Sequence, residues 1–212
     1  GLLELALGAG REIQRQAAAE LGVTYKNDGA PGSDADRIAE HLIRDGLRAM
    51  YPSVPIVSEE DLSSHGQAPA HSYFLVDALD GTREFLQGLE EYTVNIALIV
   101  CGEPTVGLIN APARQCLYWT LGNGKAWVRE GGHTEQLHAR LPHEEGVVAV
   151  TSRSGRDRKF QEFVSNHVSE TIGIGSSLKF CLLASGQADV YVRMKPTNEW
   201  DTAAGVALLR AA

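Results

Sequence analysis

The stretch FLVDALDGTREF, residues 74–85, contains the strongest structural signal in this sequence. Its apolar start is typical of a short buried strand, and it leads directly into Asp77 and Asp80. Divalent cations such as Mg²⁺ prefer oxygen ligands, and two carboxylates with a backbone carbonyl between them can bind two ions. Gly81 permits a tight turn, and Thr82 begins a segment whose N–H groups can hold a phosphate oxygen. The stretch therefore predicts a strand that ends in a metal- and phosphate-binding loop.

Acidic residues also fall at the ends of other predicted elements. A glutamate pair at 59–60 follows a short strand, Asp201 stands at the start of the last helix, and Asp36 lies near the start of the second. Each has a structural alternative: a solvated loop for the glutamates, an N-cap for Asp201, and a capping box with Ser33 for Asp36. Residues 77–82 alone could equally be a turn in which an aspartate caps backbone N–H groups. The grouping of acids at element ends favours a metal site and leaves these alternatives open.

Apolar periodicity predicts two blocks of secondary structure, joined by the polar passage 133–145. Helices and then antiparallel strands form the first block, and strands alternate with helices in the second, which predicts a layered α+β/α/β fold. The corresponding halves are residues 1–140, with the metal-binding loops, and residues 141–212. The predicted helices are 3–21, 33–51, 160–168, 177–185 and 201–212, and the predicted strands are 55–58, 73–76, 93–100, 107–109, 116–120, 125–129, 147–151, 171–174 and 189–193.

Composition and charge limit the class of protein. With 43% hydrophobic and 22% charged residues over 212 positions, the composition is that of a globular protein. No apolar run approaches the roughly 20 residues of a membrane span. A net charge of −8 argues against a nucleic-acid polymer as partner, because such binding needs a basic surface. A small phosphorylated ligand remains compatible, provided that metal ions, helix N-termini or a few Lys and Arg side chains make its site positive.

The cysteines and the chain ends bear on compartment and completeness. Cys101, Cys116 and Cys181 lack metal-ligand spacing and no export leader is visible, which predicts reduced, buried thiols in a cytoplasmic protein. The chain opens on Gly1 and stops inside a helical pattern. We therefore expect that both ends are trimmed and that the C-terminal end of the fold is missing.

Two motifs resemble the signatures of the inositol monophosphatase superfamily of Mg²⁺-dependent, lithium-sensitive phosphatases. Residues 77–82 resemble the first signature and WDTAAG, residues 200–205, the second, with VSEED, residues 57–61, upstream. The segments EYTVNIALI, GSSLKFC and KPTNEWD, which begin at residues 91, 175 and 195, are similar to bacterial 3′(2′),5′-bisphosphate nucleotidases of the CysQ type. The matches keep a fixed order from the first helix to the last residue. They imply a layered αβαβα sandwich of the sugar-phosphatase type.

Carried over by position, the resemblance implies a site for two or three Mg²⁺ ions. The implied metal ligands are the carboxylates of Glu59, Asp77, Asp80 and Asp201 and the carbonyl oxygen of Leu79. Asp36, Thr82 and Glu59 would form the catalytic set, in which Asp36 pairs with Thr82 and the hydroxyl orients or deprotonates the attacking water. The metal ions would neutralise the phosphate, activate that water and stabilise the leaving oxygen.

The resemblance also implies how the substrate is held. Gly81 and Thr82 would offer N–H groups to the phosphate, while Ser176, Lys179 and Arg193 would meet the nucleotide and its second phosphate. The alternative for Lys179 and Arg193 is solvated surface charge. The full set of implied substrate contacts is Glu59, Leu79, Asp80, Gly81, Thr82, Ser176, Lys179, Arg193 and Asp201.

Three departures from the usual family pattern bear on activity. Ala78 stands where the family usually has proline, which removes a rigid φ and no ligand. The loop KNDGAPGS, residues 26–33, differs from the usual loop that helps to close the site, which predicts reduced activity. Gly155 stands where relatives often have histidine, which puts part of the base or ribose contact in doubt.

The implied activity is hydrolysis of adenosine 3′,5′-bisphosphate to AMP and phosphate, which would recycle a by-product of sulfate assimilation. One alternative is an inositol monophosphatase or a fructose-1,6-bisphosphatase-type sugar phosphatase, which shares the metal site. Ser176, Lys179 and Arg193 favour the bisphosphate, because a monophosphate needs no second anion contact. An alternative of another class is a catalytically weak metal- or nucleotide-binding protein. The sequence leaves open a homodimer and peripheral association with the inner face of the membrane.

Overall fold

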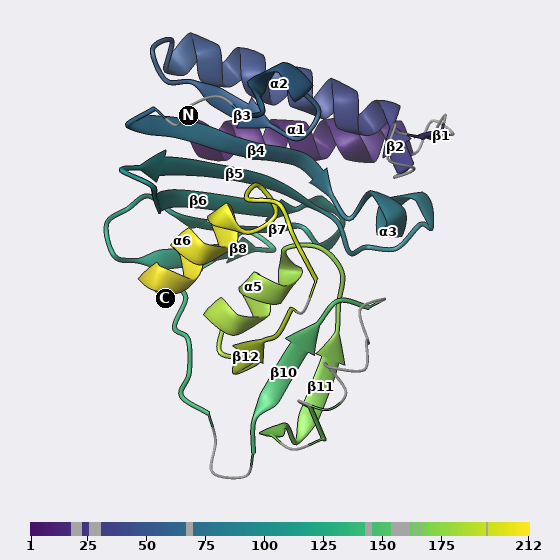
Figure 1. The fold of residues 1–212 in the computed structure, drawn as a ribbon, viewed down its shortest axis with the longest axis vertical. Helices are drawn as coiled ribbons and strands as arrows, with labels where there is room; N and C mark the ends of the chain where they lie inside the picture. Colours follow the sequence, from purple (N-terminus) through teal and green to yellow (C-terminus); the bar gives the residue numbers. More distant parts are fainter. Residues whose placement is uncertain are drawn as a thin grey trace.

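The computed structural model describes residues 1–17, 23–25, 31–66, 70–142, 146–153, 162, 164–165, 167–193 and 195–212. Helices cover both faces of a large sheet, and a small parallel sheet lies beyond one of these helices (Figure 1). The successive layers are α1 with α2, the large sheet, α5 with α6, and the small sheet. This arrangement confirms the predicted layered α/β class. Residues 160, 161, 163 and 166 of the predicted helix 160–168 lie outside the described residues, and residues 162, 164, 165 and 167 are helical. Of the predicted loop 26–33, residues 26–30 lie outside the described residues, whereas residues 31–33 form a short strand.

The large sheet has seven strands in the order β3-β4-β5-β6-β7-β8-β9, in which β3 and β4 are parallel and the other neighbours antiparallel. The small sheet has the order β11-β10-β12 and is parallel. A short antiparallel pair, β1 with β2, precedes α2. The strands are β1 Val23–Tyr25, β2 Pro31–Ser33, β3 Ile56–Ser58, β4 Ser72–Asp80, β5 Thr93–Val100, β6 Glu103–Ala111, β7 Cys116–Thr120, β8 Ala126–Glu130, β9 His133–Gln136, β10 Val148–Thr151, β11 Glu170–Gly173 and β12 Val190–Tyr191. The helices are α1 Leu2–Ala17, α2 Asp34–Met50, α3 Thr82–Leu86, α5 Leu178–Ala184 and α6 Ala203–Ala211, with 3-10 turns η1 Leu62–Ser64 and η2 Pro112–Arg114.

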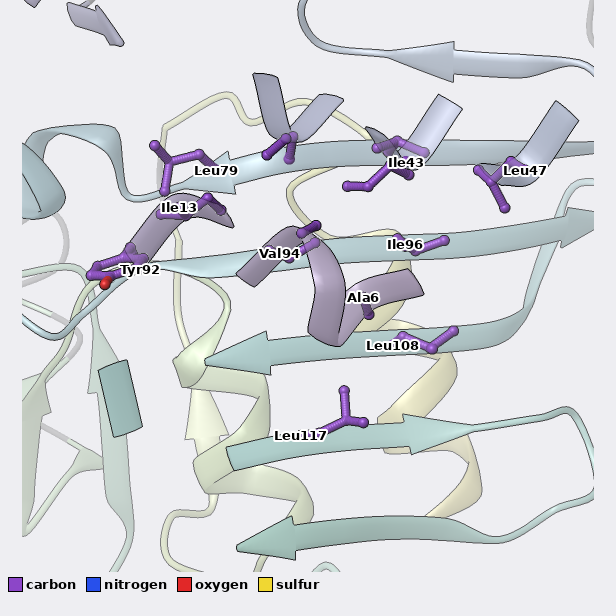
Figure 2. Packing of buried hydrophobic residues seen from close by; sticks show 14 of the residues in the cluster. Ala6, Ile13, Ile43, Leu47, Leu79, Tyr92, Val94, Ile96, Leu108 and Leu117 are labelled. Atoms are coloured by element: carbon purple, nitrogen blue, oxygen red, sulfur yellow. The ribbon is translucent and has the colours of Figure 1, made fainter. Parts of the chain in front are cut away.

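The strands of the large sheet are apolar on both faces because both faces are covered by helices. Phe74 and Val76 of β4 belong to the core formed with α1 and α2, where Ile43 packs (Figure 2). Leu75, which lies between them, points to the opposite face and belongs to a second core with Leu208 of α6. Successive side chains of a strand point to opposite faces of the sheet. A strand buried on both sides therefore has no polar alternation, which is why residues 93–100 form an almost continuous apolar run.

The last helix, α6, lies close against β6 of the large sheet. A Cβ atom on Gly107 would come within 2.4 Å of the backbone oxygen of Ala204, so a larger residue would push the helix away. The residues after 141 thus supply the small sheet and also two helices that cover the large sheet. The division of the chain into halves at residue 140 stays a prediction.

The structure corrects several predicted boundaries. The polar passage after residue 133 begins with a strand, β9, which pairs with β8 across the turn Gly131–Gly132. This edge strand is largely exposed, so it carries no apolar alternation that the sequence could reveal. The strand predicted at 189–193 is reduced to β12, and the last helix begins at Ala203 with Thr202 as its N-cap. The N-cap alternative for Asp201 is therefore wrong.

The three cysteines are free thiols, but they are not all buried. Cys116 and Cys181 are buried as predicted, whereas Cys101 is exposed in the turn between β5 and β6. The prediction of a buried thiol is wrong for Cys101, because the apolar run of β5 ends at Val100 and the chain turns there with a positive φ of 53°.

Candidate active site

A cleft of about 390 Å³ opens where the end of β4 meets the start of α5 and the segment before α6. It is lined by carboxylates, here called the carboxylate wall, and by basic and aromatic side chains, here called the basic wall. The predicted site residues that line it are Glu59, Asp80, Gly81, Thr82, Ser176, Lys179, Arg193 and Asp201. Side chains that the sequence did not single out also line it, namely Arg83, Glu84, Ser152, Phe180, Tyr191, Thr197 and Thr202. The structure thus brings most of the predicted set to one cavity.

A bulge at the end of β4 presents the predicted metal-binding loop. Asp77 pairs with Asn95 and Asp80 pairs with Thr93, so β4 contains one more residue than β5 between these two pairs. The Asp77 carboxylate accepts a hydrogen bond from the Leu79 N–H at 3.1 Å. The extra residue turns the backbone, so that the Leu79 carbonyl oxygen accepts a hydrogen bond from the Thr82 hydroxyl at 2.9 Å. Three of the predicted ligand groups, those of Asp77, Leu79 and Asp80, therefore come from one compact loop.

Gly81 closes this loop in a conformation that other residues rarely adopt. Its φ is 90°, and an added Cβ atom would lie 2.5 Å from the backbone oxygen of Glu91. Only glycine meets both requirements without strain. The tight turn predicted from the sequence is therefore confirmed. Thr82 follows as the first residue of α3.

The carboxylates of the site lie close enough to repel one another. Burial raises the pKa of Asp77 well above its ordinary value, and the charges of neighbouring carboxylates raise it further. Burial and then the charge of Asp80 likewise raise the pKa of Asp201. The carboxylates that act on Asp77 are Glu59, Asp80, Asp36 and Asp201. A divalent cation would relieve this repulsion, so the chemistry of the donor set fits a metal site.

The arrangement of these oxygens suits metal ions that share ligands. Among the described residues, no three or more His, Cys, Asp or Glu side chains converge to hold a single ion. Mg²⁺ in phosphate-processing sites commonly takes only one or two carboxylates and fills its shell with water and substrate oxygens. A carbonyl oxygen such as that of Leu79 completes such a shell, so the residues present fit Mg²⁺ ions bound together with the substrate.

Asp80 connects the loop to the start of α5. Its Oδ2 accepts hydrogen bonds from the hydroxyls of Ser176 and Ser177, each at 3.0 Å, and from the amide of Asn95 at 3.4 Å. The Ser177 hydroxyl also lies 3.0 Å from the backbone oxygen of Asp201. Ser177 and Asn95 had no predicted role. The signal for Asn95 was a polar residue inside the apolar run of β5, since a buried amide needs a partner.

Further contacts fix the positions of Asp201 and of the loop that carries Glu59. The Asp201 carboxylate accepts a hydrogen bond from the Thr197 hydroxyl at 2.6 Å and another from the Asn198 N–H at 3.1 Å. The His65 ring stacks on Trp200, with centroids 4.8 Å apart, and its Nε2 donates to the Ser58 carbonyl oxygen at 2.8 Å. The segments next to Glu59 and Asp201 are therefore joined directly.

The backbone and the side chain of Asp36 interact with different groups. Its backbone N–H donates to the Ser33 hydroxyl at 3.2 Å, so Ser33 is the N-cap of α2 and the capping prediction is confirmed for the backbone. Its side chain is buried, and its charge contributes to the raised pKa of Asp77, which places it beside the carboxylate group. The hydroxyl of Thr82 donates to Leu79 in this structure. A bond between Asp36 and Thr82 stays a prediction.

The basic wall of the cleft includes Lys179 and Arg193. Lys179 is only 5% exposed, its Nζ donates to the backbone oxygen of Ser176, and it lies 5.6 Å from the centroid of the Tyr191 ring. Burial lowers the pKa of Lys179. Arg193 is exposed, and its guanidinium donates to the backbone oxygens of Lys195 and Pro196 at 3.3 and 3.1 Å. The surface-charge alternative is therefore wrong for Lys179, while Arg193 lies at the rim.

A partly buried ion pair that the sequence did not reveal joins the segment before β5 to the segment after β10. Glu91 is 7% exposed and accepts hydrogen bonds from the Arg153 guanidinium, one of them at 3.0 Å. It also accepts one from the Gly175 N–H at 2.8 Å. Ser176, next in the chain, has a φ of 57°, a strained value for a residue with a side chain. Glu91 thus ties β5 to the loop before α5.

No helix formed by the described residues is long and apolar enough to cross a membrane. A layered α/β fold whose strand-end loops gather carboxylates in the same cleft as a buried lysine fits the class of metal-assisted phosphatases. The chain belongs to the inositol monophosphatase family, whose sequence model matches residues 2–212.

Three similar proteins carry the name CysQ. The chain is 42% identical to the 3′(2′),5′-bisphosphate nucleotidase CysQ of Escherichia coli strain K12, with 99% of this chain and 85% of that protein covered. It is 38% identical to the protein of the same name from Buchnera aphidicola, with 100% and 80% covered. The crystal structure of CysQ from Bacteroides thetaiotaomicron superposes with a TM-score of 0.80 at 32% identity, covering 98% of this chain and 83% of that one.

Proposed function

We propose that this chain is a Mg²⁺-dependent 3′(2′),5′-bisphosphate nucleotidase that converts adenosine 3′,5′-bisphosphate to AMP and phosphate. The similarity to nucleotidases at 42% identity over 99% of the chain supports this reaction. The observation that carries it for this chain is that one cleft contains both grouped carboxylates and the buried Lys179. A substrate with two phosphates uses both walls.

The carboxylate wall would hold Mg²⁺ and the phosphate that is cleaved. The proposed metal ligands are Glu59, Asp77, Asp80, Asp201 and the carbonyl oxygen of Leu79. Bound Mg²⁺, in two or three copies, supplies Lewis acidity that neutralises the phosphate and favours attack by water. The backbone N–H groups of Gly81 and Thr82 hold the phosphate oxygens at the turn before α3.

The chain's own groups then orient the water and move its proton. Asp36 and the Thr82 hydroxyl act as a pair, in which the hydroxyl accepts the proton of the attacking water as its own proton passes to Asp36. For this step the Thr82 hydroxyl must turn away from the Leu79 carbonyl, 2.9 Å distant. Glu59, at the edge of the same cleft, completes the catalytic set.

The basic wall would select the bisphosphate. Lys179 needs an anionic partner because a buried ammonium group is costly when its charge is not compensated. Ser176, Lys179 and Arg193 all line the cleft, where they can meet the second phosphate and the nucleoside. A sugar or inositol monophosphate leaves this wall without an anion. The proposal includes a cytoplasmic location, in keeping with the free thiols, and a homodimer as the assembly to test.

Phosphate release tests the reaction and the substrate together. Adenosine 3′,5′-bisphosphate, inositol 1-phosphate and fructose 1,6-bisphosphate are compared, each with Mg²⁺ and with EDTA. We expect Mg²⁺-dependent release with a strong preference for the nucleotide. A preference for inositol or sugar phosphate would keep the metal site and remove the proposed role of Lys179. Metal binding without turnover of any substrate would instead support a binding protein.

A further inference from the structure

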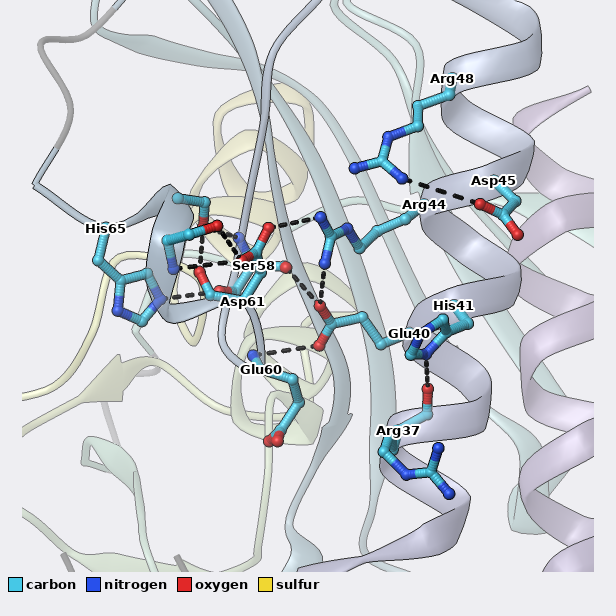
Figure 3. A network of polar contacts seen from close by, with 12 residues as sticks. Arg37, Glu40, His41, Arg44, Asp45, Arg48, Ser58, Glu60, Asp61 and His65 are labelled. Atoms are coloured by element: carbon cyan, nitrogen blue, oxygen red, sulfur yellow. Dashed lines mark hydrogen bonds and ion pairs between the residues drawn. The ribbon is translucent and has the colours of Figure 1, made fainter. Parts of the chain in front are cut away.

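The loop that carries Glu59 is held from behind by a buried glutamate on α2. Glu40 is only 3% exposed. One of its carboxylate oxygens accepts a hydrogen bond from the Ser58 hydroxyl at 2.6 Å, and the other accepts one from the Glu60 N–H at 3.1 Å (Figure 3). These two donors belong to the residues immediately before and after Glu59. Glu40 therefore holds the chain on both sides of this proposed metal ligand.

The rest of the loop leaves Glu59 little freedom to move. The Glu59 N–H donates to the Val76 carbonyl oxygen at 3.2 Å, which extends the pairing of β3 with β4 by one residue. With its backbone fixed at this bond and its neighbours fixed by Glu40, the residue keeps one direction for its side chain. That direction leads into the cleft, whose lining includes Glu59.

The buried charge of Glu40 is compensated by one cation. Arg44 donates to Glu40 at 3.3 Å and also to the Asp61 carboxylate, so it closes the network around the loop (Figure 3). Its side chain is 19% exposed, and so is largely shielded from water. A buried carboxylate that accepts three hydrogen bonds, one of them from a cation, is satisfied, whereas removal of its charge leaves Arg44 partly uncompensated.

The spacing on α2 connects this network to the reaction site. Asp36, Glu40 and Arg44 are separated by four residues each and so lie along one side of the helix. Asp36 lies in the first turn of α2, which packs against β4, and Glu40 reaches the loop that carries Glu59. One helix thus fixes two parts of the site relative to each other.

We propose that Glu40 is a positioning residue, which sets the place of the Glu59 carboxylate in the metal site by holding Ser58 and Glu60. The proposal rests on the proposed function only in taking Glu59 as a metal ligand. It does not depend on the identity of the substrate. Partners behind metal ligands commonly change metal affinity by about 10–100-fold when they are removed.

Metal binding without substrate tests the proposal. Mn²⁺, a paramagnetic substitute for Mg²⁺, is titrated into the full chain and followed by electron paramagnetic resonance. Glu40→Gln keeps the shape of the side chain, but an NH2 group, which cannot accept, replaces one of the two oxygens that accept from Ser58 and Glu60. We expect the Mn²⁺ dissociation constant to rise about 10–100-fold, while the circular dichroism spectrum stays that of the native protein. Asp45→Asn, which changes an exposed pair 3.9 Å apart on the same helix, serves as the control and should leave affinity unchanged.

A double-mutant cycle shows whether Glu40 acts through Glu59. In a Glu59→Gln background the ligand is already lost, so adding Glu40→Gln should change Mn²⁺ affinity by less than about 2-fold. An equal loss in both backgrounds would overturn the proposal, and so would native Mn²⁺ affinity in Glu40→Gln. If Glu40→Gln does not fold, Ser58→Ala carries the test, because it removes one of the two hydrogen bonds. Unchanged Mn²⁺ affinity in that variant would also overturn the proposal. Failure to hydrolyse the nucleotide would contradict the proposed function and would not affect these Mn²⁺-binding results.

Discussion

The two walls of the cleft differ in charge, in origin and in how firmly they are held. The carboxylate wall comes from strand ends of the large sheet, where Asp77 is 1% exposed and backbone bonds fix the loop. The basic wall comes from α5 and from the segment around β12, where Arg193 is exposed and bonded to carbonyl oxygens two and three residues away. The groups proposed for chemistry and those proposed for substrate choice thus lie on separate elements. A substitution in one wall should therefore leave the function of the other measurable.

The largest effect is expected when a carboxylate is removed from the carboxylate wall. Asp77→Asn should lower Mg²⁺-dependent kcat/KM by about 1000-fold or more, because a buried ligand oxygen loses its charge. The metal-free protein should not lose thermal stability, because one member of a mutually repelling group has been neutralised. Activity assays and thermal unfolding in EDTA check the two parts. Near-native turnover would remove Asp77 from the metal site.

Substitutions of Thr82 distinguish between two roles of its hydroxyl, acting on the attacking water and holding the Leu79 carbonyl oxygen. If it acts on the attacking water, Thr82→Ala should lower kcat about 100-fold and leave KM nearly unchanged. Thr82→Ser keeps the hydroxyl and should keep most of the activity. A loss of metal affinity with native kcat at saturating Mg²⁺ would assign the hydroxyl to holding Leu79 instead, as it does in this structure.

The basic wall should affect choice between substrates and leave the reaction itself intact. Lys179→Met keeps the buried apolar stem and removes the ammonium group. We expect kcat/KM for adenosine 3′,5′-bisphosphate to fall about 10–100-fold more than kcat/KM for a nucleoside 3′-monophosphate. This difference corresponds to the loss of about 1.5–3 kcal/mol, the contribution of a hydrogen bond to a charged group. Lys125→Met, at an exposed position, is the matched control. An equal loss on both substrates would contradict a selective role.

The smallest expected effect concerns the ion pair that joins β5 to the loop before α5. Burial raises the pKa of Glu91, but the hydrogen bonds from Arg153 and the Gly175 N–H outweigh it, so the pKa in the folded protein is lowered. The ionised carboxylate therefore contributes stability above its unfolded pKa of about 4.3, and this contribution is lost as pH falls through the folded pKa. Because Arg153 is half exposed, we expect Glu91→Gln to cost about 1 kcal/mol at neutral pH.

Thermal unfolding of Glu91→Gln at several pH values checks this effect. The difference in Tm from the native protein should be largest above about pH 5 and should shrink below about pH 4. Glu90→Gln, at the exposed neighbouring position, should show no such trend. A constant difference across this range would mean that the charge of Glu91 contributes nothing to stability.

The sequence by itself determined the features that are encoded by neighbouring residues. The apolar run of β5, the Gly81 turn and the ligand loop of β4 are all contiguous, so periodicity and residue type predicted them without knowledge of the fold. The family followed from several such segments in order. Short edge strands such as β9 escaped prediction because their side chains are exposed and carry no pattern.

Only the tertiary structure decided which charged residues are buried and what they hold. Lys179 and Arg193 look alike in the sequence, yet one is buried against Tyr191 and the other is exposed. Glu40 and Glu91 resemble ordinary solvated glutamates until the chain brings Ser58, 18 residues away, and Arg153, 62 residues away, into contact with them. The physical reason is that burial and hydrogen bonding between distant segments depend on how the layers pack, and no local pattern of residues records that packing.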